Sequence, residues 1–218
     1  MDGTLLDSMY YWRHAPIDYF AGRGITISEE LFNDMYIGKI QFTRALARQL
    51  AGGDIDIPAM LECTRSIVRA HYETDIALKP RADEYLRLLR TSGVRCMLAT
   101  ATWDYMVIPL LHRLGIYNYF TEDNAGGGEV YTVCADELGM DKASPEYFPT
   151  LMRRFGLQPQ DCVLFAESAY AMRNAHKAGL GVWAIEEHAS TQTRGEIELL
   201  ADRLVSSWGE LCDGKILP

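Results

Sequence analysis

Apolar residues in the first third of the chain recur at helical spacing. Trp12, Ile17 and Phe20 fall on one face of a first helix, which Gly22 and Gly24 end. Further stripes of the same spacing begin near Ser28, Phe42 and Pro58. This part of the chain therefore predicts a bundle of four helices.

After Lys79-Pro80 the pattern changes to short apolar runs of strand length. These runs cover residues 94–102, 131–135, 162–168 and 181–186. Helical stretches at 106–114, 145–155 and 171–178 separate them. Apolar strands that alternate with helices are typical of a parallel sheet covered on both faces. The sequence thus predicts an α/β fold, with a core formed by residues 1–8 and 79–218 and a helical insert at 9–78.

Polar residues with chemical potential follow the predicted strands. Ligands of open parallel sheets bind beyond the carboxyl ends of the strands. Thr100 and Thr102 end the first run, Glu167 ends the third, and Lys142 lies in the loop before a predicted helix. A hydroxyl can donate to a phosphoryl oxygen, a lysine offsets its charge, and carboxylates are ligands that Mg²⁺ prefers. Together these residues indicate a phosphate-handling site.

Composition narrows the class of partner and the compartment. The formal net charge of −9 over 218 residues argues against binding of nucleic acid, which needs lysine and arginine, but leaves a small anionic substrate possible. The five cysteines form no CxxC pair, as is typical of a reducing compartment. No apolar run is long enough to span a membrane, and no signal peptide is evident. We expect a cytoplasmic protein without a membrane partner.

Several motifs make the sequence similar to one family. They are DGTLLDS at residues 2–8, KASPEYF at 142–148, GLQPQDCVLFAES at 156–168 and NAHKAGLGVWAI at 174–185. The chain resembles the haloacid dehalogenase-like hydrolase superfamily, in the branch with a helical cap that includes beta-phosphoglucomutase and small sugar-phosphate phosphatases. The resemblance covers essentially the whole chain and implies a Rossmann-like parallel sheet with an inserted four-helix cap.

The resemblance also implies roles for individual residues. Asp2 matches the general acid/base, Thr100 the phosphate-binding hydroxyl and Lys142 the phosphate-binding lysine. Asp2, through its carbonyl, and Glu167 match the Mg²⁺ ligands. The family's nucleophilic aspartate and its strand would come just before Met1, so we expect a truncated chain that is inactive as it stands. Loss of catalysis is the alternative explanation.

Substrate contacts and metal binding are less closely defined by the motifs. Thr4 and Thr102 are candidate substrate-binding residues, and Lys39 lies where related caps present a substrate-contacting loop, although it could equally be an exposed lysine. Ala166-Glu167-Ser168 stands where the motif of the family commonly reads Glu-Asp-Ser or Gly-Asp. The longer side chain could shift or weaken Mg²⁺ binding, because this ion demands near-octahedral geometry.

The leading hypothesis is a Mg²⁺-dependent phosphatase that hydrolyses a small phosphorylated metabolite through an aspartyl-phosphate. A phosphomutase of the beta-phosphoglucomutase type is a close variant. A non-catalytic module that binds a phosphorylated ligand or a protein is the alternative from another class, and a 2-haloacid dehalogenase is less favoured by the DGT motif. We expect a monomer or a weak homodimer.

Overall fold

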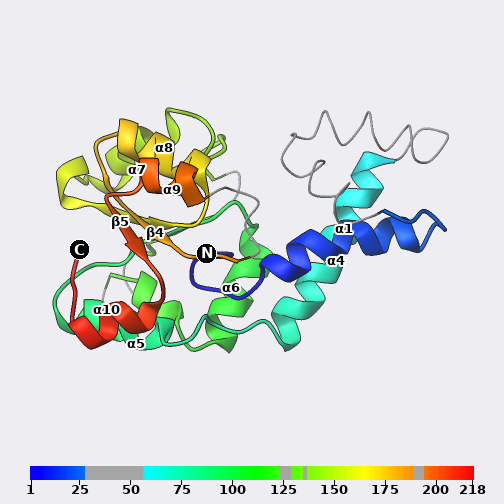
Figure 1. The fold of residues 1–218 in the computed structure, drawn as a ribbon, viewed down its shortest axis with the longest axis horizontal. Helices are drawn as coiled ribbons and strands as arrows, with labels where there is room; N and C mark the ends of the chain where they lie inside the picture. The colour runs from blue at the N-terminus through cyan, green and yellow to red at the C-terminus, as the bar shows by residue number, and fades with distance from the viewer. Residues whose placement is uncertain (28–55, 123–128, 135–136, 189–193) are drawn as a thin grey trace. The chain divides into compact units, whose positions relative to one another are not determined.

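The computed structural model describes residues 1–27, 56–122, 129–134, 137–188 and 194–218. The chain divides into two compact units, which Figure 1 shows in ribbon form. One unit combines Met1–Asp7 with Ala77–Pro218, and the other is Ser8–Ile76. We refer to them as the core and the insert.

The described part of the insert consists of two helices, α1 (Met9–Ala21) and α4 (Ile57–Thr74). The Asp56 side chain caps α4 by accepting a hydrogen bond from the amide of Ala59 (3.0 Å). The two helices pack on each other, and the indole of Trp12 donates to the hydroxyl of Tyr72 (3.3 Å). The other two helices expected in this unit, and Lys39 between them, lie outside the described residues, so the four-helix bundle stays a prediction.

The core alternates strands and helices, as the sequence predicted. Its helices are α5 (Ala82–Thr91), α6 (Asp104–Arg113), α7 (Tyr147–Phe155), α8 (Ala169–Lys177), α9 (Arg194–Leu200) and α10 (Trp208–Gly214). Its strands are β1 (Leu98–Ala99), β2 (Thr132–Val133), β3 (Val163–Ala166), β4 (Gly181–Ile185) and β5 (Arg203–Val205). Every strand pair is parallel among the described residues, which confirms the α/β class.

The parallel strands of the described chain form two sheets. One contains β1 and β2, and the other has the order β3-β4-β5, with Phe165 opposite Trp183 and Ala184 opposite Leu204. Both sheets contribute to one apolar cluster with α7 and α8, in which Val133 of β2 and Ala166 of β3 are buried. A shared apolar cluster keeps the carboxyl ends of β1 and β3 near one another.

The two chain segments that border the insert are hydrogen-bonded to each other within the core. Leu6 and Leu78 form an antiparallel bridge. On either side of it, Asp7 N donates to Ala77 O (3.1 Å) and Lys79 N donates to Leu5 O (2.7 Å). The DGTLLDS motif is thereby anchored through residues 5–7, near its C-terminal end.

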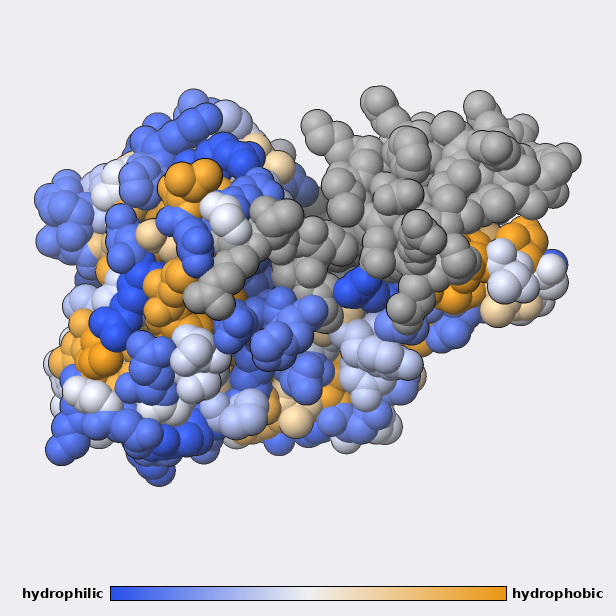
Figure 2. All heavy atoms as spheres, in the orientation of Figure 1, coloured by the Kyte–Doolittle hydropathy of each residue, from blue (hydrophilic) through white to orange (hydrophobic). Residues whose placement is uncertain are grey.

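The surface in Figure 2 is mostly hydrophilic where residues are coloured, with limited apolar areas between the polar ones. Leu199 is the most exposed of the large apolar side chains among the described residues, at 88%. The helices in the described part of the chain all fall short of the length or the apolar character that crossing a lipid bilayer requires.

Candidate functional site

The site is built around the tight loop at residues 1–6. The carbonyl of Met1 accepts hydrogen bonds from the amides of Thr4 (3.2 Å), Leu5 (2.8 Å) and Leu6 (3.2 Å). Gly3 has a φ of +64°, which is costly for a residue with a Cβ. The glycine of the DGT motif therefore permits the tight turn that places Asp2 and Thr4.

The carboxylate of Asp2 lies at the end of β1. Its Oδ2 accepts a hydrogen bond from the Thr102 hydroxyl (3.0 Å), and the Thr102 amide donates to Thr100 Oγ1 (3.2 Å). Both threonines are buried. The structure thus brings Asp2 to two predicted site threonines that lie about 100 positions further along the chain.

Glu167 follows directly on β3 and reaches the same loop. Its Oε2 accepts a hydrogen bond from the buried hydroxyl of Thr4 at 2.8 Å. Thr4 and Thr102 were candidate substrate ligands, and in the structure each hydroxyl donates to a carboxylate instead. Both substrate assignments stay predictions, and the geometry adds a role for both threonines in orienting Asp2 and Glu167.

Lys142 approaches the site from the loop before α7. Its ammonium group lies 3.4 Å from the carbonyl oxygen of Ala99, the last residue of β1. The side-chain amide of Asn174 in α8 donates to the carbonyls of Lys142 (3.0 Å) and Ala143 (2.9 Å), which holds this loop in place. The sequence analysis assigned no role to Asn174, because its burial in α8 is visible only in the structure.

The charged groups of the site interact with one another at the start of the chain. Burial lowers the pKa of the Met1 amino group, and the charge of Lys142 lowers it further. Asp2 and Glu167 act on the same group in the opposite direction. The charges of one lysine and two carboxylates therefore all act on the amino group of Met1.

The donor set of the site fits Mg²⁺. The described residues contain no group of three or more histidine, cysteine, aspartate and glutamate side chains placed to hold a metal. Mg²⁺ is nevertheless commonly held by one or two carboxylates, with water and phosphate as its other ligands. Glu167 offers a carboxylate oriented by Thr4, and Asp2 offers further oxygen atoms two residues before Thr4 in the same loop.

Known proteins with similar sequences belong to the hydrolases and phosphatases. A model of the haloacid dehalogenase-like hydrolases matches residues 1–179. A glyceraldehyde 3-phosphate phosphatase of Methanopyrus kandleri is 30% identical over 122 residues, which are 52% of this chain and 46% of that protein. A phosphoglycolate phosphatase of Thiobacillus denitrificans is 24% identical over 217 residues, or 96% of this chain and 90% of the relative.

A similar fold occurs in a solved structure, that of a putative beta-phosphoglucomutase from Thermotoga maritima. Its TM-score is 0.75 at 19% identity, and the match covers 100% of this chain and 97% of the other. At this identity the likeness concerns the fold alone. The family match, in contrast, includes the loop with Asp2 and Thr4, the lysine at 142 and the carboxylate at 167. The chain therefore belongs to the haloacid dehalogenase-like hydrolase family.

Proposed function

We propose that this chain is a Mg²⁺-dependent phosphatase that acts on a small phosphorylated metabolite. One observation carries the proposal: hydrogen bonds join the loop at residues 1–6, which contains Asp2, to Glu167 and to the segment after β1, and Lys142 lies at the end of β1. A lysine next to two carboxylates suits a phosphoryl group, because the lysine offsets its charge and a carboxylate can recruit a cation or transfer a proton.

Each residue has a distinct task in this proposal. Lys142 binds a phosphoryl oxygen. Thr100 Oγ1 already accepts a hydrogen bond from the Thr102 amide, so its own proton can be donated to a second phosphoryl oxygen. Thr102 holds the Asp2 carboxyl group, which protonates the leaving oxygen and later takes a proton from the attacking water. Mg²⁺ held by Glu167 and the carbonyl of Asp2 would supply positive charge next to the phosphoryl oxygens.

The proposed substrate is small and anionic. Glyceraldehyde 3-phosphate and phosphoglycolate, the substrates in the names of the two relatives, are suitable first candidates. The net charge of −9 disfavours a nucleic-acid substrate, because polyanions are bound mainly by lysine and arginine. We further propose a cytoplasmic location and a monomer or weak dimer.

A phosphatase assay with two forms of the protein tests the proposal. The family's nucleophilic aspartate corresponds to the position before Met1, so one form is residues 1–218 and the other carries an added apolar strand ending in Asp. We expect the extended form to release phosphate from the substrate in a Mg²⁺-dependent reaction. The shorter form should show no appreciable turnover. Asp2→Asn should abolish the activity, whereas Asp18→Asn in α1 serves as a matched control.

Glu167 variants of the extended form test the metal site. Glu167→Asp should keep or improve the Mg²⁺ response, and Glu167→Ala should reduce it sharply, with partial rescue at high Mg²⁺.

Three outcomes would count against this function. Turnover by residues 1–218 that is unchanged by Asp2→Asn would contradict the mechanism. Binding of phosphate esters without turnover by either form would favour the non-catalytic module, and interconversion of sugar phosphates would favour the mutase.

A further inference from the structure

The C-terminal helix α10 reaches the candidate site through one side chain. Trp208 is the first residue of α10 and is buried. Its indole Nε1–H donates a hydrogen bond of 3.0 Å to the carbonyl oxygen of Thr4, across 204 positions of the chain. The family match ends at residue 179, so this contact comes from outside the matched residues.

The indole is held firmly on its other sides. Its ring packs on Tyr85 of α5, with centroids 5.2 Å apart, and on Phe165 of β3, with centroids 5.4 Å apart. Aromatic rings packed in this way leave little freedom to a side chain that has only two rotatable bonds. The position of the Nε1–H group is therefore set by α5 and β3 as well as by α10.

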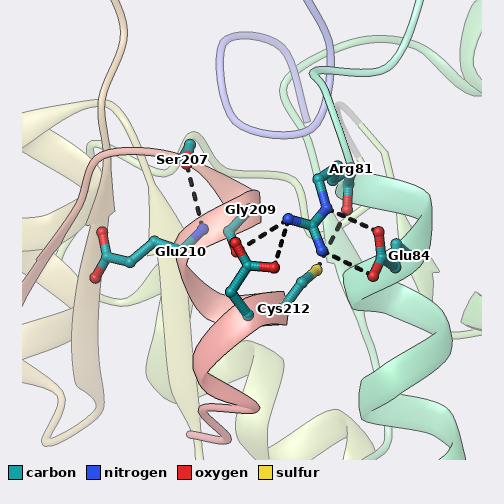
Figure 3. Close-up of polar contacts among 7 residues, drawn as sticks. Arg81, Glu84, Ser207, Gly209, Glu210 and Cys212 are labelled. Atoms are coloured by element: carbon teal, nitrogen blue, oxygen red, sulfur yellow. Dashed lines mark hydrogen bonds and ion pairs between the residues drawn. The ribbon is translucent and has the colours of Figure 1, made fainter.

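Arg81 fastens α10 to α5, as Figure 3 shows. Its guanidinium donates to both carboxylate oxygens of Glu84 (2.8 and 2.9 Å) and to Asp213 Oδ1 (2.8 Å), and it lies 3.5 Å from the carbonyl of Gly209. In return the Cys212 thiol donates to the carbonyl of Arg81 at 3.8 Å. Arg81 itself adopts φ = +66°, a conformation that few residues other than glycine take. These contacts hold α10, from Gly209 to Asp213, against the start of α5, and α10 carries Trp208.

Thr4 transmits this position to Glu167. Its carbonyl accepts from Trp208, and its hydroxyl donates to Glu167 Oε2 at 2.8 Å. We propose that Trp208 is a positioning residue of the site, which fixes Thr4 and through it the orientation of the Glu167 carboxylate. The inference rests on the proposed function for its catalytic meaning, but the physical coupling can be measured in the protein without turnover.

Indole signals of ¹⁵N-labelled residues 1–218 provide the first measurement. The chain has four tryptophans, so each indole can be assigned by substitution. Thr4→Val removes the hydroxyl bond to Glu167 and keeps the Thr4 carbonyl, and Glu167→Gln changes the charge of its acceptor. Both should move the Trp208 indole signal, because hydrogen-bonded groups polarise one another. Glu137→Gln, which alters a carboxylate bonded to the Cys134 amide, should leave that signal in place.

Amide exchange of the loop gives the converse measurement. Trp208→Phe keeps an aromatic ring and removes the donor, so the amides of Thr4, Leu5 and Leu6 should exchange roughly 2- to 10-fold faster, the range expected for one lost hydrogen bond. Trp183→Phe is the matched control, because its ring also packs on Phe165 but belongs to β4. Amides of α8 report whether the fold as a whole is retained.

The inference is overturned if the Trp208 signal ignores both Thr4→Val and Glu167→Gln, or if Trp208→Phe leaves loop exchange unchanged. The first arm keeps Trp208 in place and so decides the matter even where Trp208→Phe fails to fold. A lack of phosphatase activity in the extended form would refute the proposed function, and it would not alter the coupling measured here. The two ideas can therefore fail separately.

Discussion

The polar contacts of the site in the core and the ion pairs of helix α4 in the insert differ in sequence separation and in burial. At the site, hydrogen bonds join residues 100, 163 and 204 positions apart, and the threonines that take part are buried. In α4 of the insert, the ion pairs join residues three or four positions apart on the exposed face of one helix, as in Arg65–Glu62 and Arg69–Glu73. Between α1 and α4 of the insert, the edge-to-face pair of Trp12 and Tyr72 includes the indole hydrogen bond, and the Tyr11 hydroxyl donates to exposed Asp75 (3.1 Å).

The difference shows where geometry is fixed in this protein. A buried polar group that loses its partner pays the cost of desolvation, so long-range buried bonds hold one arrangement against others. An exposed pair one helical turn apart contributes only about 0.3–0.5 kcal/mol, and water replaces either partner when the pair breaks. We therefore expect substitutions at the site to change function strongly and those on α4 to change it little.

The largest expected effect separates two cations, one in each region. In whichever form of the protein is active, Lys142→Ala should lower kcat/KM about 10²- to 10³-fold, because a charge aimed at the phosphoryl group is lost. Thr100→Val should reduce transition-state stabilisation by less, about 0.5–1.5 kcal/mol, since it removes one neutral hydrogen-bond donor. Arg69→Ala on the exposed face of α4 is the control and should have no effect. Equal rates for all three variants would place the site elsewhere.

A smaller effect contrasts two buried polar side chains. Asn174→Leu leaves the carbonyls of Lys142 and Ala143 without their donor and should lower the free energy of unfolding of the core by about 1–3 kcal/mol. Thr64→Val in α4 removes a hydroxyl that donates to the carbonyl of Met60, four residues back in the same helix, and should stay within about 0.5 kcal/mol of the parent. Urea unfolding measures both. A larger loss for Thr64→Val would break the comparison.

The smallest effect concerns an exposed carboxylate of the insert. The hydrogen bond from His71 is the main reason that the pKa of Asp75 lies below its ordinary value of 3.8. A lowered pKa stabilises the folded state above the unfolded value and loses that contribution as pH falls through the folded one. His71→Ala should therefore flatten the acid side of the thermal stability profile between about pH 2 and pH 5 and slightly lower stability above it.

His112→Ala is the control for this measurement, because the His112 ring stacks on the ring of Tyr117, with centroids 4.2 Å apart. Its acid profile should match that of the parent. An unchanged profile for His71→Ala would show that Asp75 is not held by this contact.

Much of the core was predictable because its signals are local. The apolar run at 162–168 contains β3, and the run at 181–186 contains β4, since buried parallel strands are apolar throughout. Strand β5 was missed, because only two of its three residues are apolar and they follow Asp202 and Arg203. Helix α10 was also missed, although Ser207 and Glu210 have the spacing of a capping box and the Ser207 hydroxyl accepts from the Glu210 amide (3.3 Å).

By itself, the sequence determined the α/β class and selected the candidate site residues, because strand period, turn residues and motif spacing are properties of neighbouring positions. Asp2, Lys142 and Glu167 could be selected in this way, from their places after strands and from the motifs around them. Only the tertiary structure decided what orients them: Thr4 on Glu167, Thr102 on Asp2, Asn174 beneath Lys142 and Trp208 behind Thr4. These partners are 32 to 204 positions apart, and a hydrogen bond over such a separation exists only once packing has brought the two segments within about 3 Å of each other.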